Sequence, residues 1–355
     1  MLEGHLGVFF GLDVVEVDGD TEITEEPRAY RVSLAYDEAY EDVQHETVDP
    51  ALPPEPGLIP SIKRFFGMGD ARLLEPSTHT FRRREQVCFL PDEIRELATK
   101  PGADTIQALV IGDWITAYEA GGSQEVLAAL VDSADKFNNL EALFFADIPS
   151  EECELSWIVQ TNFDPLWAAY PKLREFHVRG GNKLSLGTVQ HKKLQVLVIE
   201  TGGLPASVVE EVCQADLPAL EHLELWLGEE NYGWRGPLDV LDPILSGKCF
   251  PRLRYLGLKN FEKTDTLVKK LVDAPILKRL ETLDLSMGTL GDEGALALAA
   301  CPHVAKLDAL DVSHHFMTAK GMDALRALGI DVDMSEQLEE ETYDDESWRY
   351  IAAGE

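Results

Sequence analysis

The chain has 355 residues, of which 45% are apolar, so it is long enough to bury a large core and has the composition of a soluble globular protein. Its 31 basic and 64 acidic residues give a formal net charge of -33, which argues against nucleic acid or an anionic membrane as a ligand, because neutralising phosphate requires a patch of Lys and Arg. No apolar run approaches the length of a membrane span.

The first 100 residues do not repeat, and we expect them to form an α+β cap region. Residues 7–17 and 30–36 are rich in Val, Phe and Tyr, which predicts strands. Residues 49–57 (DPALPPEPG) indicate a Pro-rich linker, and residues 91–99 begin with Pro-Asp-Glu, which predicts a short helix. Because the first unit of a repeat array exposes apolar surface unless another segment covers it, we expect residues 1–100 to cap the array that follows.

A basic island interrupts this region between residues 63 and 84. It mixes Phe side chains with Lys63, Arg64, Arg72, Arg82, Arg83 and Arg84. Basic and aromatic residues together can bind single-stranded nucleic acid. In so acidic a chain, an internally ion-paired surface or contact with the acidic N-terminal segment is the favoured interpretation.

From residue 101 to 330 the pattern L-x-x-L-x-L recurs in a fixed setting. The eight copies begin at Ile106, Leu140, Leu173, Leu194, Leu220, Leu253, Leu280 and Leu307. The first apolar residue of each copy turns into the core, and the next two alternate inward along a strand. Each unit predicts a strand, a turn and an amphipathic helix, and stacked units must cover one another's apolar sides. The fold class is therefore α/β, with a parallel sheet on the concave side of a curved solenoid and helices on the convex side.

The spacing of the copies predicts where the units differ. The start-to-start steps are 34, 33, 21, 26, 33, 27 and 27 residues. The steps of 33 and 34 predict insertions after repeats one, two and five. The step of 21 predicts that repeat three lacks a full helix, which agrees with the polar, Gly-rich residues 179–187.

These units resemble the leucine-rich repeat family, most of all its ribonuclease-inhibitor-like type. The likeness lies in the units of 26 to 28 residues and in residues 290–295 (LGDEGA). A closer resemblance, through residues 202–206, 217–228 and 244–247, is to bacterial cytoplasmic leucine-rich repeat proteins that have no assigned activity. The resemblance implies a solenoid of about eight repeats and transfers no catalytic or binding residues.

The last 25 residues, 331–355, contain ten acidic side chains and one basic side chain. We expect them to form an acidic, solvated tail that could dock through Trp348 and Tyr350.

The cysteines are five in number and widely scattered: Cys88, Cys153, Cys213, Cys249 and Cys301. They show no C-x-x-C pairing and no disulfide framework, which predicts free thiols in a reducing cytoplasm. A buried free Cys acts as a small hydrophobic residue.

A ligand would meet the third, fifth and seventh positions of each copy, because these alternate with the buried leucines. This face is apolar toward the N-terminal repeats and acidic toward the C-terminal ones. The residues expected to contact a partner are Phe144, His177, Arg179, Glu200, Glu224, Trp226, Tyr232, Trp234, Tyr255, Lys259, Asp284 and Asp311. Exposed aromatics beside carboxylates are usual interface anchors. In the alternative interpretation, Trp226 and Trp234 pack against each other to hold the insertion after repeat five.

We therefore predict a monomeric, non-enzymatic module that uses no cofactor and binds a protein, expected to be basic, through its concave face. One alternative is an inhibitor or immunity protein that blocks a basic enzyme, and another is a structural part of a larger assembly. A rival of another class is a metal-binding protein or hydrolase that uses His314, His315 and Asp311, or a centre at His177. No nucleotide-binding, nucleophile-elbow or zinc-protease motif supports the rival.

Overall fold

The structure is a computed structural model, and it describes residues 5–18, 20–24, 26–33, 90–114, 116–343 and 346–354. The predicted Pro-rich linker, the basic island and Cys88 lie outside the described residues. The described residues belong to one compact unit of the chain.

One sheet of twelve strands runs through this unit in chain order. The first two strands are antiparallel, and every later neighbour is parallel. The strands are β1 (Val8–Phe9), β2 (Leu12–Glu16), β3 (Ala29–Val32), β4 (Ala108–Ile111), β5 (Ala142–Phe145), β6 (Glu175–Arg179), β7 (Val196–Glu200), β8 (His222–Gly228), β9 (Tyr255–Phe261), β10 (Thr282–Asp284), β11 (Ala309–Asp311) and β12 (Asp331–Asp333).

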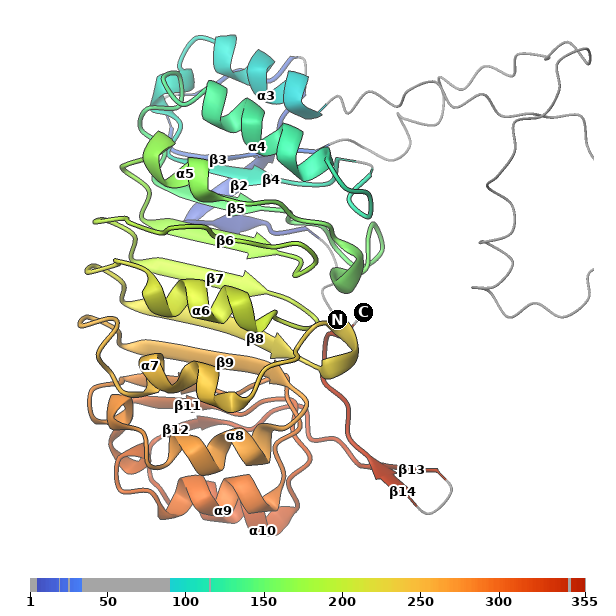
Figure 1. Ribbon diagram of the computed structural model, residues 1–355, viewed down its shortest axis with the longest axis vertical. Helices are drawn as coiled ribbons and strands as arrows, with labels where there is room; N and C mark the ends of the chain where they lie inside the picture. The colour runs from blue at the N-terminus through green and yellow to red at the C-terminus, as the bar shows by residue number, and fades with distance from the viewer. Residues whose placement is uncertain are drawn as a thin grey trace, which may run out of the picture. The chain divides into compact units, whose positions relative to one another are not determined.

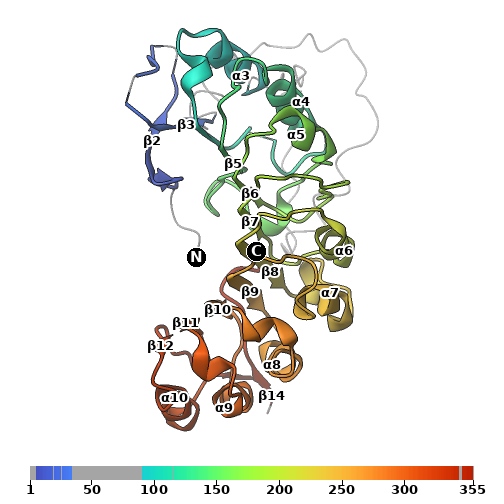
Figure 2. The same ribbon diagram turned by 90° about the vertical axis from the view of Figure 1, so that its left-hand side faces the viewer.

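The helices lie on one side of this sheet, which curves around its other side (Figures 1 and 2). They are α3 (Leu90–Thr99), α4 (Gly122–Asp132), α5 (Asp164–Ala169), α6 (Ala206–Gln214), α7 (Asp242–Leu245), α8 (Thr264–Leu271), α9 (Asp292–Ala300) and α10 (Ala319–Arg326). Short 3-10 helices occupy η1 (Ala103–Thr105), η2 (Leu155–Trp157), η3 (Glu230–Tyr232), η4 (Leu238–Leu241), η5 (Pro275–Lys278) and η6 (Val304–Lys306).

Each of the eight copies of the pattern contains a strand, which begins at the third position of the pattern. The buried residues between these positions, such as Leu109, Leu143 and Leu256, form one core between the sheet and the helices. Residues 180–195, all of which the structure describes, contain no helix, as the short third step predicted. The fold is a leucine-rich repeat solenoid with a non-repeat N-terminal region.

The N-terminal region continues the sheet beyond the repeats. Helix α3 confirms the helix expected at residues 91–99. The expected strand at 7–17 is a hairpin of β1 and β2, because Phe10 and Gly11 adopt left-handed φ angles of 55° and 68° and turn the chain. Strand β3 begins one residue before the strand expected at 30–36 and overlaps its start, and it pairs with both β2 and the first repeat strand. The boundary between the cap region and the repeats at residue 100 remains a prediction.

The C-terminal region departs from the expected solvated tail. Residues 331–333 form β12, a further parallel strand after the eighth repeat. A separate hairpin of β13 (Glu341–Tyr343) and β14 (Glu346–Trp348) follows. The chain then returns to the solenoid, where Ile351 and Ala353 are buried. The burial of these two apolar side chains explains the return, because leaving them in water would lose the hydrophobic free energy that their burial provides.

Four cysteines lie in the described residues, and all four are free. Burial raises the pKa of both the Cys153 and the Cys213 thiol to about 12, so these thiols are poor nucleophiles at neutral pH. Across the part of the chain that the structure describes, no helix is both long and apolar enough to cross a membrane.

Candidate binding surface on the concave face

The register of the strands decides which side chains share the concave face. Third positions pair with third positions and fifth with fifth along the whole array. The fifth positions therefore form a ladder of side chains spaced about 4.8 Å apart, the distance between neighbouring strands. From β4 to β12 this ladder consists of Val110, Phe144, His177, Val198, Glu224, Gly257, Asp284, Asp311 and Asp333.

The apolar N-terminal part of this face is covered by the chain itself. Phe9 of the β1–β2 hairpin packs against Phe144, with ring centroids 6.1 Å apart, and against His177 at 5.3 Å. Phe144 is only 2% exposed. The expectation that Phe144 contacts a partner is therefore wrong for this structure, because the hairpin already uses its apolar surface.

A buried ion-pair network next to this hairpin occupies two more of the expected residues. Arg179 Nε donates to Glu200 Oε2 at 2.8 Å, and Arg179 Nη1 donates to the carbonyl of Ile148 at 2.7 Å. Arg31 binds Asp147, which lies 3.6 Å from Arg179. Arg179 and Glu200 are buried and satisfied within the chain, so they hold strands and loops together rather than meeting a ligand.

Both expected tryptophan anchors are buried too. Trp226 is 4% exposed and clusters with Leu155 and Ala353. Trp234 joins the main core, where its ring meets Phe261 edge-on at 5.3 Å. The two tryptophans thus belong to different clusters, and the alternative in which they pack against each other is also wrong.

Glycines allow the insertion of repeat five to approach the preceding turn. A Cβ atom on Gly203 would clash with the backbone of Tyr232. Gly228 has a φ of 72°, and a Cβ atom there would clash with the carbonyl group of Gly202. Tyr232 itself lies beside Gly354, so the insertion and the C-terminal segment meet there. Only glycine fits these close backbone contacts.

The centre of the face is a hydrogen-bonded network around Glu224. Its carboxylate accepts from Trp226 Nε1 at 2.6 Å, and it lies 3.3 Å from the Tyr255 hydroxyl oxygen and 3.4 Å from Lys259 Nζ. Burial alone would raise its pKa, but hydrogen bonds from His222 and Trp226 and the Lys259 charge outweigh that effect and lower the pKa of Glu224 to about 2.

Asp284 belongs to the same network. It accepts from the Tyr255 hydroxyl and lies 3.2 Å from Lys259 Nζ, and it is buried. Lys259 thus neutralises part of the charge of both carboxylates. Contrary to the prediction from the sequence, little negative charge remains at Glu224 and Asp284 to attract a basic partner.

The ladder ends in less shielded carboxylates. Asp311 is partly buried, and Asp333 is exposed. In the described residues no Lys or Arg pairs with either. Burial, together with the negative charges of Asp284 and Asp333, raises the pKa of Asp311 above its usual value. The accessible negative charge is therefore concentrated at the C-terminal end of the face.

Beside the ladder, third-position side chains remain partly accessible. The rings of His222 and Tyr255 stack at 3.8 Å with an angle of 6°, and His177 Nε2 lies 3.0 Å from Glu175 Oε1. Asp333 also lies in this open area, but it was not among the residues predicted from the sequence, because β12 does not follow the leucine that begins the other copies of the pattern. The alternation Asp331-Val332-Asp333 could have predicted this strand.

The rival histidine centre is not assembled. His314 Nδ1 lies 3.2 Å from the carbonyl of Gly288. His315 contacts the carbonyl of Met334 through Nε2 and accepts from the amide of Met317 through Nδ1. Both imidazoles therefore contact backbone groups. Among the described residues, no group of three or more His, Cys, Asp or Glu side chains could hold a metal ion.

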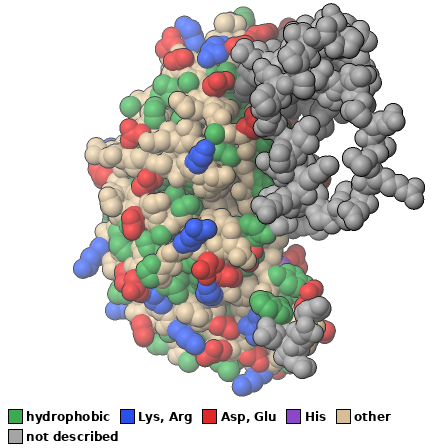
Figure 3. Space-filling view, turned by 45° about the vertical axis from the view of Figure 1, so that its right-hand side comes forward, with side chains coloured by type: hydrophobic (Ala, Val, Ile, Leu, Met, Phe, Trp, Pro, Cys, Tyr) green, Lys and Arg blue, Asp and Glu red, His purple; other side chains and the backbone are tan. Residues whose placement is uncertain are grey.

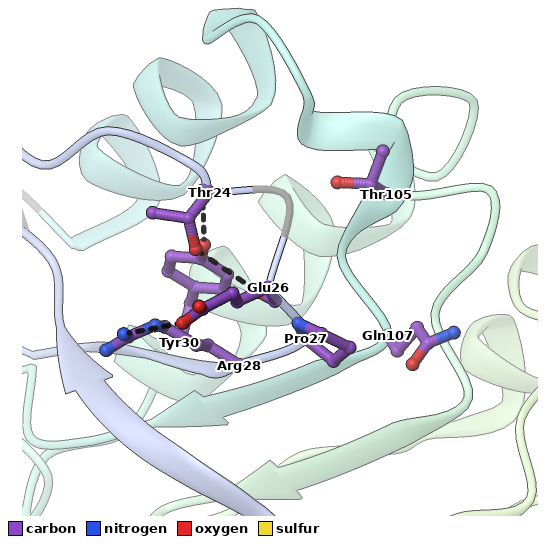
Figure 4. A pocket seen from close by; sticks show the side chains of 7 residues that line it. All are labelled: Thr24, Glu26, Pro27, Arg28, Tyr30, Thr105 and Gln107. Carbon is purple, nitrogen blue, oxygen red and sulfur yellow. Dashed lines mark hydrogen bonds and ion pairs between the residues drawn. The ribbon is translucent and has the colours of Figure 1, made fainter.

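A hollow of about 210 Å³ lies away from this face, beside the start of the repeats (Figure 4). It is lined by Thr24, Glu26, Pro27, Arg28, Tyr30, Thr105 and Gln107. Its polar groups bond to one another, as in the 3.1 Å contact from the amide of Thr24 to the Tyr30 hydroxyl. It is smaller than the pockets that usually hold a cofactor.

The chain is similar to a Bacteroides fragilis protein whose crystal structure was determined by a structural genomics consortium. The two share 33% identity and a TM-score of 0.66, over 69% of this chain and 70% of the other. A Listeria monocytogenes internalin covers the same shares at 13% identity and a TM-score of 0.34, which is too low to establish a shared fold. No protein-family model and no curated protein matches the chain.

Proposed function

The chain belongs to the same family as the Bacteroides fragilis protein, and from this premise we propose that it is a non-enzymatic leucine-rich repeat module that binds a protein through its concave face. The observation that supports the proposal is the open window in that face. The N-terminal hairpin covers one end and the C-terminal segment covers Trp226. Between and beyond them most third-position side chains are at least partly accessible, and so are Asp311 and Asp333 at the fifth position.

The chemistry of the window favours a basic partner. Asp311 and Asp333 have no cationic partner in the described residues, and Asp331 is exposed on the same strand as Asp333. The stacked His222 and Tyr255 provide a flat aromatic surface on the same face, two strands away from Asp311. A Lys or Arg side chain of a partner would relieve the mutual repulsion of the carboxylates, while a second, apolar or cationic side chain would pack on the rings.

Within this proposal, the chain is a monomeric, cytoplasmic protein of the ribonuclease-inhibitor-like type that needs no cofactor. Its strong negative charge opposes self-association and steers a basic partner toward it. The partner-binding residues are Asp311, Tyr255 and His177, now joined by Asp333.

The test is retention of proteins from native lysate on the immobilised chain at low salt, followed by elution with a salt gradient. We expect Asp311→Lys combined with Asp333→Lys to weaken retention of the main basic partner roughly 10-fold, because each partly exposed ion pair is worth about 0.2–1 kcal/mol and reversal adds repulsion. The control combines Glu125→Lys on α4 with Glu210→Lys on α6, which makes the same change in net charge at exposed positions on the convex side. Equal retention by the two forms would contradict the proposal.

A second candidate is an inhibitor of a basic enzyme, which the acidic end of the face also favours. Once a partner is isolated, its activity measured with and without one equivalent of the chain separates the two. An inhibitor abolishes that activity, whereas a passive binding module leaves it unchanged.

A further inference from the structure

The C-terminal hairpin is a sheet of its own. Strands β13 and β14 pair only with each other, with Glu341 opposite Trp348 and Thr342 opposite Ser347. Figure 1 shows the hairpin extending away from the solenoid. Each strand therefore has one edge that no described strand covers. A two-stranded hairpin is marginally stable in water, and a third strand or a packing surface is needed to stabilise it.

Both ends of this hairpin are held by the solenoid. Before it, the Gln337 side chain donates to the carbonyl of Met317 at 2.9 Å. After it, Arg349 Nη1 donates to Asp265 Oδ2 and to the carbonyl of Thr289, each at 3.1 Å. The hairpin is thus presented from a fixed base, which reduces the entropy that a partner must overcome to bind it.

An exposed tryptophan marks the hairpin as an interaction surface. Trp348 is 57% exposed and Tyr350 is 44% exposed. The Tyr350 ring packs edge-on against the buried Phe316 at 5.6 Å, so the residue that follows the hairpin is anchored on the solenoid. In Figure 3, hydrophobic side chains gather over this part of the molecule at the lower right. Exposed tryptophans are frequent anchors of protein interfaces.

Carboxylates surround this anchor. Glu339, Glu340 and Glu341 are consecutive, and Glu341 lies opposite Trp348 across the hairpin. The nearby Arg349 pairs with Glu340 at 2.7 Å and with Asp265, so in the described residues Glu339 and Glu341 have no ion-pair partner. Directly opposite residues share a face of the hairpin, so Glu341 and Trp348 lie on the same face. Every second residue of a strand added to this edge would also lie on that face, so a segment whose same-face positions alternate between basic and apolar would meet both Glu341 and Trp348.

We propose that the hairpin β13–β14 is a second docking element, separate from the concave face, to which a basic extended segment of a partner protein adds as a third strand with Trp348 as its anchor. Backbone hydrogen bonds to the open edge would provide affinity, and contacts of the partner with Trp348 and the neighbouring glutamates would provide selectivity. The proposal does not require the concave face to bind anything.

The probe is a labelled synthetic peptide that repeats Arg-Thr-Val-Thr, which places Arg and Val in turn on the same face of an extended strand. It is titrated against the full chain by fluorescence anisotropy. We expect Trp348→Ala to weaken its binding about 10-fold or more, as for a truncated anchor. Trp157→Ala is the matched control, because Trp157 is 48% exposed and lies in the separate segment η2, and it should change the affinity by less than about 2-fold, as for a residue outside the interface. A peptide with Gly in place of Val keeps the charge and should show no dependence on Trp348.

Two results would overturn the proposal. One is equal affinity of the Arg-Thr-Val-Thr peptide for the Trp348→Ala and Trp157→Ala variants. The other is loss of peptide binding in the Asp311→Lys, Asp333→Lys form alone, which would place the peptide on the concave face and leave the proposed function intact. Slower amide exchange at Ser347 and Trp348 on adding the peptide would show directly that the hairpin edge is occupied.

Discussion

Asn260 is the residue whose replacement tests most directly how the C-terminal segment is held. Its side chain is fully buried, and its amide donates to the carbonyls of Ala353 and Thr201 while its oxygen accepts from the Ala353 amide at 3.0 Å. Its φ of 54° is left-handed, a conformation that Asn adopts more readily than Ala. We expect Asn260→Ala to release residues 351–354 from the solenoid.

The magnitude follows from the contacts that are lost. Three hydrogen bonds at about 1 kcal/mol each give about 3 kcal/mol, and the left-handed backbone adds about 1 kcal/mol for Ala. Asn260→Gly loses the same bonds without the backbone strain, so it should cost about 3 kcal/mol. In a chain that ends at Tyr350, two of the three bonds are already absent. The cost of Asn260→Ala should then fall by about 2 kcal/mol.

The assay is urea denaturation of the full chain and of the chain that ends at Tyr350, each with and without the Asn260→Ala substitution. The four free energies of unfolding form a double-mutant cycle whose coupling term isolates the Asn260–Ala353 contact. A coupling close to zero would refute the inference that Asn260 holds the C-terminal segment. Equal costs for Asn260→Ala and Asn260→Gly would refute the contribution of the backbone conformation.

Three further predictions concern the concave face. The pKa of Glu224 is lowered from 4.5 in the unfolded chain to about 2 in the folded chain. The ionised carboxylate therefore stabilises the fold above about pH 4.5, and this stabilisation is lost as the pH falls toward about 2. Glu224→Gln should reduce the fall of the urea midpoint over this acidic range. The pKa of Asp311 is raised, so its ionised form opposes folding at neutral pH; Asp311→Asn should raise the urea midpoint at about pH 7, and an unchanged or lower midpoint would contradict this. Phe9→Ala should cost about 3 kcal/mol in urea denaturation and increase binding of an apolar dye by uncovering Phe144, unlike Val8→Ala, which alters an exposed side chain.

The repeat strands could be predicted from the sequence because their cause is local. Alternation of apolar residues over six positions determines which side chains face the core, as at Leu283 and Leu310. Strand β12 escaped prediction because it does not follow a leading leucine. For β3 the strand itself was expected, but its parallel place between β2 and β4 was not. Both strands extend the sheet beyond the repeats. The local sequence of such a strand does not determine which neighbouring strand it pairs with.

The candidate site was predicted only in part. Positions on the concave face follow from period and register, so Tyr255 and Asp311 lie where the pattern placed them. Whether such a position is open depends on segments remote in sequence. Phe9 covers Phe144 from the far N-terminal end of the chain, and Ala353 covers Trp226 from the C-terminal end.

The sequence by itself determined the solenoid, the orientation of its faces and its acidity, because backbone periodicity and composition act over a few neighbouring residues. Only the tertiary structure decided that both ends of the chain fold back onto the concave side, and that Lys259 and Arg179 neutralise carboxylates which looked available. Burial and ion pairing depend on contacts between distant segments. Their free energies arise only when the whole array has assembled.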